Sequence, residues 1–483
     1  MSKVFSGLIW KFLERFGTVG IQFIIQIILA RLLSPDDYGA IALITVFITV
    51  SNVFVQNGFN TALIQRQDVT EEDYSSVFWI SMLVALICYI ILFILSPFIA
   101  DFYSMSVLNN VLKVLGLTLF FGAYNSIQIA KISKEFKFKK LFYSSLIGMC
   151  ISGITGIILA MNRFGVWTLV FQQLLNQIII SFVLYFQVDW KLKIVVNIKR
   201  VKLLFGFGSK LLVSSLIDVI YNNIYNLVIG KVYDSTTLGY YNRADQFPNL
   251  IVNNVNGSIQ SVILPALAEH QDNKPRVKEM MRKAMTLSSY LVFPLMIGMA
   301  ACAEPMIELL LTDKWLPCVP YLRLLCFSYM LWPIHTANLQ AINALGHSEI
   351  FLKLEIIKKV IGIIALVIST PFGVIAMVSM KVITSIISTF INALPNKSLL
   401  NYSYKSQIFD LLPTFIISTI MGILVFVTDN LLKVISLGIL SRLILDVIIG
   451  IIIYIILSLI TKNKNFKYFL DMLKKIFTKK GDV

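Results

Sequence analysis

Long apolar segments follow one another along the whole chain, and short polar stretches separate them. A helix needs about 20 apolar residues to cross a bilayer, and the pattern predicts about fourteen such helices. The expected spans are residues 12–33, 40–63, 77–99, 108–130, 141–161, 165–187, 204–230, 247–267, 284–304, 318–345, 357–371, 373–394, 408–428 and 434–460. The pattern therefore predicts an all-α polytopic membrane protein.

The composition agrees with this class. The chain is 57% hydrophobic and only 14% charged, with a mean hydropathy of +0.80, whereas a soluble domain has about a quarter of its residues charged. The net charge of +16 follows membrane topology, because 31 of the 42 Lys and Arg fall in alternate segments between the spans and at the termini. Since cytoplasmic loops carry the excess of Lys and Arg, both termini are expected in the cytoplasm. Nucleic acid is not an expected partner.

Internal repeats divide the chain in two. ARLLSPDDYG has its counterpart two hundred residues later in GKVYDSTTLG. Further matches follow in the same order at slightly larger offsets, and they align Lys113 with Arg323 and Gln173 with Lys381. The expected domains are two six-helix bundles, residues 1–203 and 204–400, followed by two extra helices and a basic tail in residues 401–483. Parallel repeats of this kind occur in secondary transporters, and they predict a cleft between the halves that opens alternately to each side.

The helix that opens each half carries a polar line. Residues four apart stay on one side of a helix, and polar residues recur at that spacing in both halves. They are Glu14, Thr18, Gln22 and Gln26 in the first half, and Lys210, Ser214, Asp218, Asn222 and Asn226 in the second. Interhelical hydrogen bonding would explain such residues, but their aligned positions in both halves favour a polar wall of the cleft.

Charged residues within the spans predict the sign of the cargo. Lys381 lies near the middle of its span, where it is expected to face the cleft. Lys210 either faces the cleft or extends to the cytoplasm, and Asp218 either pairs with it or titrates during transport. Arg323 and Lys113 line the outer half of the cleft or anchor the interface. A surplus of cations predicts an anionic cargo, for which phosphate and pyrophosphate suit Lys and Arg.

Three further sets of charged or titratable residues are considered; two of them have two alternative roles, and the third is expected to form a salt bridge within its own helix. Glu14 and Arg15 form a local ion pair or a gate near the cytoplasmic entrance. His335 is a proton carrier or a satisfied buried histidine. Arg442 and Asp446 stand four residues apart on one helix, and we expect a plain salt bridge between them.

Other function classes find little support in the sequence. It contains no GxxxxGK[ST] phosphate loop, no metal-ligand spacing among its five cysteines and no soluble segment large enough for a nucleotide domain. We therefore expect no cofactor and no metal. The basic tail FKYFLDMLKKIFTKK is expected to lie as an amphipathic helix on anionic lipid.

Several strings resemble a known family. LARLLSPDDYGAIALITVF, GFNTALIQRQDVTEEDYSSVFW, FKFKKL and GVWTLV are similar to the N-terminal half of Wzx-type polysaccharide flippases, as are FGFGSKLL and IGKVYDSTTLGYYNRADQFP. EPMIELLLTDKWLPCVPYLRLL and LQAINALGHSE continue the resemblance, which covers about residues 1–395. The branch that these strings resemble is the colanic-acid-exporter-like one, within the multidrug/oligosaccharidyl-lipid/polysaccharide (MOP) superfamily.

The resemblance implies a V-shaped, two-lobed exporter in the bacterial inner membrane. It would move undecaprenyl-pyrophosphate-linked oligosaccharide repeat units to the outer leaflet for lipopolysaccharide O-antigen, capsule or exopolysaccharide synthesis. Thr18, Gln22 and Gln26 would then meet sugar hydroxyls, opposite Asp218, Asn222 and Asn226. The implied partners are the lipid-linked oligosaccharide, membrane lipid, a polysaccharide polymerase and glycosyltransferases, and the chain would act as a monomer. The alternatives are a peptidoglycan-precursor flippase or small-molecule antiporter of the same superfamily, and a membrane-embedded polymerase or ligase.

Overall fold

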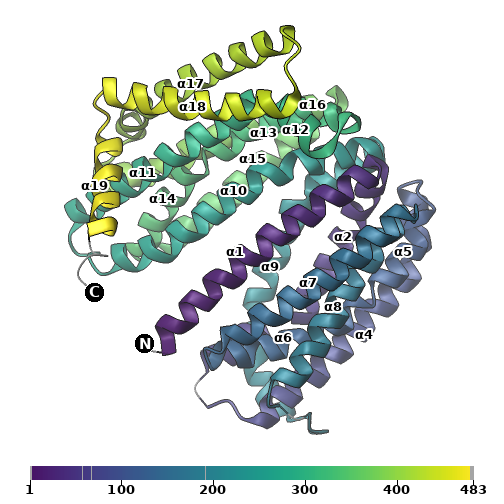
Figure 1. Ribbon diagram of the computed structural model, residues 1–483. Helices are drawn as coiled ribbons and strands as arrows, with labels where there is room; N and C mark the ends of the chain where they lie inside the picture. The colour runs from purple at the N-terminus through teal and green to yellow at the C-terminus, as the bar shows by residue number, and fades with distance from the viewer. Residues whose placement is uncertain (1–2, 57, 67, 191, 479–483) are drawn as a thin grey trace. The chain divides into compact units, whose positions relative to one another are not determined.

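The computed structural model describes residues 3–56, 58–66, 68–190 and 192–478, and in these ranges every regular element is a helix (Figure 1). The chain forms two compact units, residues 1–242 and 243–483. The boundary lies inside helix α10, so it differs from the division at residue 204 that the repeats suggest; the repeat-based domains stay a prediction.

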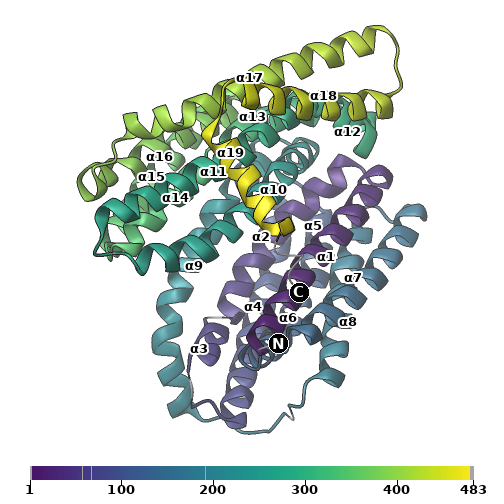
Figure 2. The same ribbon diagram turned by 60° about the vertical axis from the view of Figure 1, so that its left-hand side comes forward.

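In its described residues, the first unit contains nine helices and the beginning of a tenth. They are α1 (Lys3–Leu32), α2 (Pro35–Gln56), α3 (Phe59–Gln65), α4 (Glu71–Phe102), α5 (Val107–Leu115), α6 (Thr118–Lys134), α7 (Phe138–Met161), α8 (Val166–Gln187), α9 (Ile198–Val232) and the first turns of α10 (Ser235–Ala268). Helices α1, α7 and α8 run side by side (Figures 1 and 2), and α2 packs against α4, α6, α8 and α9.

The second unit holds the rest of α10 and the remaining helices. They are α11 (Lys274–Ala301), α12 (Ala303–Leu311), η1 (Asp313–Cys318), α13 (Val319–Met330), α14 (Trp332–Ala344), α15 (Ser348–Ser369), η2 (Thr370–Phe372), α16 (Val374–Leu400), α17 (Tyr404–Val434), α18 (Ile439–Ile460) and α19 (Lys464–Thr478). Helices α17 and α18 form a neighbouring pair, and α17 packs on α11 (Figures 1 and 2).

Local sequence signals set several helix starts. Thr70 and Asp73 form a capping box at the start of α4, in which the Asp73 carboxylate accepts from the Thr70 backbone N–H at 2.8 Å. At the starts of α9, α11 and α17, the side chains of Asn197, Asn273 and Ser403 each accept from the backbone N–H three residues later. A capping side chain of this kind satisfies a backbone N–H that the first helical turn leaves unpaired.

Ten helical segments of the described chain are long and apolar enough to cross a membrane. Many of their large apolar side chains are exposed, as Ile90, Ile91 and Ile94 of α4 are, which suits a lipid-facing surface. The polytopic all-α class is thus confirmed, whereas the count of fourteen stays a prediction. The segment between the expected spans 204–230 and 247–267 is mostly helical, because α10 begins at Ser235.

The two repeated turns found in the sequence meet one another within the first unit. The starts of α2 and α10 pack so closely that a Cβ added to Gly39 would stand 2.5 Å from the carbonyl carbon of Ser235, and one added to Gly239 would stand 2.8 Å from that of Pro35. Neither distance leaves room for a side chain. The glycine that ends each repeat is therefore required by a reciprocal backbone contact, as in close helix packing within membranes.

Candidate functional site

A charged site lies in the second unit, where α10, α13 and α16 meet. Lys381 of α16 donates from Nζ to Oδ1 of Asp245 on α10 at 3.2 Å, and the Tyr329 hydroxyl of α13 donates to the same oxygen at 3.0 Å. The side chains of Lys381 and Asp245 keep 27% and 23% of their exposure. The two side chains thus form a partly buried ion pair that is still exposed enough for a ligand to reach.

The local sequence explains why Asp245 lies at this depth. The Asp234 carboxylate accepts from the Thr237 backbone N–H at 2.6 Å and starts α10 early. Ten residues separate Ser235 from Asp245, which places the carboxylate about 15 Å along the helix axis. The Asn249 amide, one turn later, donates to the other Asp245 oxygen at 3.3 Å. Polar residues one turn apart therefore continue the site along α10.

Arg243 plays a different part although it lies two residues from Asp245. Its side chain is buried, donates to Gln246 and lies 5.8 Å from the Trp315 ring centroid. A buried guanidinium that is bonded and stacked in this way holds its surroundings together. We therefore assign the ligand-accessible cation of this site to Lys381.

A second polar cluster surrounds His335 on α14. Its ring nitrogens lie 3.1 Å from the Asn392 amide and 3.4 Å from the hydroxyls of Ser385 and Thr389. These partners are neutral. One turn along α14, Asn338 exchanges hydrogen bonds with Gln407 and Asn396, and the network ties α14 to α16 and α17.

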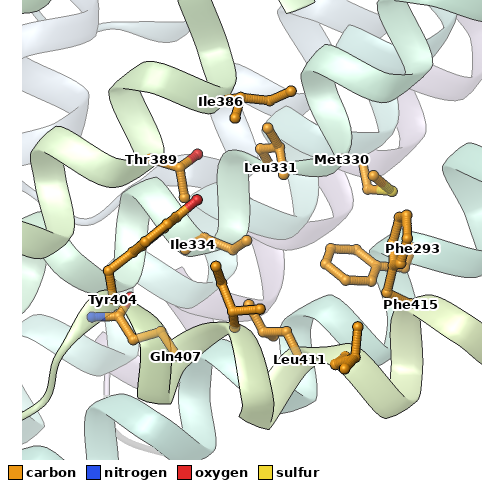
Figure 3. Close-up of a pocket in the computed structure, with 12 residues that line it drawn as sticks. Phe293, Met330, Leu331, Ile334, Ile386, Thr389, Tyr404, Gln407, Leu411 and Phe415 are labelled. Carbon is orange, nitrogen blue, oxygen red and sulfur yellow. The ribbon is translucent and has the colours of Figure 1, made fainter. Parts of the chain in front are cut away.

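An apolar pocket of 250 Å³ adjoins this cluster (Figure 3). Aromatic and aliphatic side chains line it, among them Phe293 and Phe415, and Thr389 belongs both to the lining and to the His335 cluster. The pocket carries no charged side chain among its described lining residues. It is suited to an apolar chain and not to the anionic part of a ligand.

The polar lines of α1 and α9 have mixed surroundings. On α1, the Thr18 hydroxyl bonds to the Glu14 carbonyl, Gln22 is exposed and Gln26 is half-buried. On α9, Asp218 and Asn222 are exposed, while Asn226 bonds to Asn223 at 3.4 Å and to Asn242 at 3.3 Å. The side chains of Arg15 and Lys210 lie outside the described residues. That these lines form a wall of a cleft stays a prediction.

The remaining cations lie against their own bundles. Arg323 donates to the Ala300 carbonyl at 3.3 Å and lies 5.3 Å from the Phe426 ring. Lys113, its repeat counterpart, stands 4.8 Å from the Phe93 ring centroid. Within the second unit, the described contacts of Arg323 therefore include neither Lys381 nor Asp245, and Lys113 contacts an aromatic ring of its own unit.

Asp245 and Tyr329 are site residues that the sequence did not predict. The repeat itself held the signal for Asp245, since the alignment of ARLLSPDDYG with GKVYDSTTLG places Asp245 level with Thr45, ten residues into α2. The hydropathy pattern did not place Asp245 in a helix, because the first turns of α10 are polar. A second expected contact also differs in the structure. Arg442 pairs with Asp429 of α17 at 2.7 Å, so the prediction of a salt bridge between Arg442 and Asp446 is wrong.

Known proteins resemble the chain in sequence and in fold. A family model described as polysaccharide biosynthesis protein matches residues 28–320. The succinoglycan biosynthesis transport protein ExoT of Rhizobium meliloti (strain 1021) is 24% identical over 66% of this chain and 65% of its own. The lipopolysaccharide biosynthesis protein WzxC of Escherichia coli (strain K12) is 23% identical over 87% of this chain and 88% of its own.

Two solved structures share the fold. One is the lipid II flippase MurJ in an inward closed conformation, with a TM-score of 0.75 and 19% identity over 94% of this chain and 98% of its own. The other is an inward-facing multidrug resistance MATE family transporter of the MOP superfamily, with a TM-score of 0.63 and 15% identity over 80% of this chain and 96% of its own. The fold is therefore that of the MOP superfamily.

Proposed function

Because the chain belongs to the polysaccharide biosynthesis protein family, we propose that it is a flippase for undecaprenyl-pyrophosphate-linked oligosaccharide repeat units. The resemblance to that family drawn from the sequence is confirmed by the family match and by the similarity to WzxC. The proposal is of a transporter and not of an enzyme, and similarity to proteins described as a transport protein and a flippase supports it.

The Lys381–Asp245 pair is the observation that carries the cargo assignment. A lysine at membrane depth is costly unless it is paired or faces water or ligand, and Lys381 is both paired and partly exposed. Pyrophosphate offers several charged oxygens that compete with the single Asp245 oxygen for the ammonium group. Lys381 would then bind the cargo as a point charge, while Tyr329 and Asn249 keep the Asp245 carboxylate hydrogen-bonded.

This exchange gives a reason for reversible binding. Without cargo, Asp245 satisfies Lys381, so the empty site carries no bare charge in a medium of low dielectric constant. With cargo, the ammonium group moves to the pyrophosphate, and release restores the original pair. A site that is satisfied in both states favours turnover over permanent capture of the anion.

The placement in the cell is part of the same proposal. We place the chain in the bacterial inner membrane with both termini in the cytoplasm, supported by the asymmetry of Lys and Arg. The monomer, acting beside a polysaccharide polymerase and glycosyltransferases, belongs to the proposal too. The cleft between the two sequence halves and its alternating exposure complete it, supported by the parallel repeats.

A complementation experiment tests the proposal. In a strain lacking the gene, lipid-linked repeat units should accumulate inside the cell, and the wild-type gene should restore surface polysaccharide. Lys381→Ala should lower the export rate by about 10- to 150-fold, which corresponds to the loss of a charge-assisted hydrogen bond. Lys283→Ala removes an exposed lysine that pairs with Glu279 and serves as the matched control. Normal intracellular levels of repeat units in the deletion strain would refute the function.

A further inference from the structure

A second cavity lies wholly within the first unit and has a different chemistry. It has a volume of 350 Å³ and lies where α2, α3, α6 and α8 meet. Seven amide side chains line it; six of them are Asn52, Gln56, Asn60, Gln173, Asn176 and Gln177, and no charged side chain is among its described lining residues. The cavity is therefore polar without being charged.

Most of these amides are unused by the protein. Gln177 accepts from the seventh amide, Asn125, at 3.0 Å, and the Asn125 oxygen accepts from Ser181 at 2.8 Å. No hydrogen bond joins Asn52, Gln56, Asn60, Gln173 or Asn176 to another residue that the structure describes. An amide carries both donors and an acceptor, so the cavity wall offers both kinds of group at once.

Unused amides at membrane depth need a polar occupant. Polar groups in a membrane-spanning bundle are costly unless they meet a partner or a wet cavity. Five such amides around one cavity exceed what interhelical bonding would require, since α2, α6 and α8 already pack against one another. Gly122 on α6 also keeps the space open, because a Cβ there would stand 3.0 Å from the Asn52 amide oxygen.

The repeat relates this cavity to the charged site of the second unit. Thr45 and Gln173, which both line the cavity, stand level in the two sequence halves with Asp245 and Lys381. One half thus has a neutral hydroxyl and amide where the other has an ion pair. The equivalent positions differ in charge while keeping their polarity, so the first unit suits a neutral polar group and the second unit a charged one.

We propose that the cavity among α2, α3, α6 and α8 is a binding subsite for a neutral, hydroxyl-rich sugar residue of the cargo. The proposal rests on the proposed function and adds to it the part of the substrate that the first unit recognises. A sugar hydroxyl donates and accepts, and so matches the amides in both directions. The volume of 350 Å³ equals that of about twelve water molecules, which suits a sugar ring better than a single ion.

Binding measurements on the purified full chain in lipid nanodiscs test the subsite. The two probes are undecaprenyl pyrophosphate and the lipid-linked repeat unit extracted from the deletion strain. Wild type should bind the repeat unit more tightly, because only that probe carries sugar. Asn52→Leu combined with Gln173→Leu should weaken binding of the repeat unit by about 25- to 100-fold, at about five- to tenfold for each of the two lost hydrogen bonds. Binding of undecaprenyl pyrophosphate should stay unchanged.

Two further variants guard against a folding artefact. Gly122→Leu fills the cavity from the opposite wall and should give the same selective loss with all the amides intact. Asn430→Leu is the matched control, because Asn430 is exposed on α17 and its one hydrogen bond among the described residues goes to the Phe426 carbonyl of its own helix. Thermal unfolding of each variant separates lost binding from lost structure.

The outcomes distinguish the subsite from the proposed function. If wild type prefers the repeat unit and both cavity variants retain that preference, the cavity holds water only and the subsite proposal is overturned while the flippase proposal stands. If wild type binds neither probe, the proposed function itself fails. An equal loss of both probes in the cavity variants would also overturn the subsite, because it would show a general effect on the protein.

Discussion

The reciprocal glycine contact gives the sharpest structural prediction. In Gly39→Ala the new Cβ would clash with the Ser235 carbonyl oxygen and would lie 2.5 Å from its carbonyl carbon, against an ordinary contact of 3.4 Å or more, so the starts of α2 and α10 must part by more than 1 Å. Forcing extra volume into a packed contact costs about 1–3 kcal/mol. Under the proposed alternation between two states, that cost would lower the population of the state that contains this contact by about 5- to 150-fold.

Disulfide cross-linking measures this population. The Ser235 hydroxyl bonds to the Asp36 carboxylate, so Asp36→Cys with Ser235→Cys places two thiols across the contact. Gly39→Ala added to this pair should slow cross-linking at least fivefold and lower polysaccharide export, since one state becomes harder to reach. Adding Gly239→Ala should have little further effect, because both glycines serve one contact and their effects are not independent.

Gly20→Ala is the control for this series. Gly20 is exposed on α1, and a Cβ there meets nothing within 4 Å. Cross-linking and export should both equal those of wild type. An unchanged cross-linking rate in Gly39→Ala would refute this prediction, because it would show that the starts of α2 and α10 do not need the close approach seen in the structure.

Three more predictions concern charges and a helix start. Asp245→Asn should lower export and thermal stability because it leaves Lys381 without its carboxylate. The double variant Asp245→Asn with Lys381→Met should regain thermal stability but not export. Recovery of export in the double variant would contradict the role of the lysine. Arg442→Ala should cost about 3–5 kcal/mol, since it leaves the buried Asp429 unpaired, and a melting temperature equal to that of wild type would contradict this. Thr70→Ala should cost about 1 kcal/mol through loss of the α4 cap, measured by the same thermal unfolding with Thr419→Ala, which has an exposed hydroxyl on α17, as the control.

Hydropathy and repeats predict the helices well, because lipid demands long apolar segments and leaves few alternatives. Helices α4, α7, α8 and α18 each overlap an expected span. The failures lie at polar helix starts: α10 begins twelve residues before its expected span at 247, since a capped, polar first turn carries no hydropathy signal.

Side-chain partners were harder to predict than helices. The sequence indicated Lys381 from its depth in a span, but its partner Asp245 comes from a helix far away in the chain. The Arg442 partner is also on another helix, α17, and not four residues away. Spacing along one helix predicts which residues share a face, whereas the choice of partner depends on how helices pack, which local spacing does not encode.

The amide-lined cavity shows the same limit from another side. Among its amides the repeat picks out Gln173 alone, as the counterpart of Lys381, since single Asn and Gln residues in spans are readily explained by interhelical bonding. Only the packing of α2, α3, α6 and α8 shows that they converge on one space. The repeat then connects that space with Lys381 and Asp245 in the other half.

Transfer of lipid-linked repeat units between the leaflets of proteoliposomes tests the central claim most directly. The purified chain is reconstituted in vesicles whose repeat units begin in one leaflet, and the fraction reaching the other leaflet is followed with a sugar-binding reagent that does not cross the membrane. We predict that wild type accelerates transfer far above protein-free vesicles and that Lys381→Ala slows it by about 10- to 150-fold. Transfer by wild type at the protein-free rate, in vesicles where the protein is folded, would contradict the account.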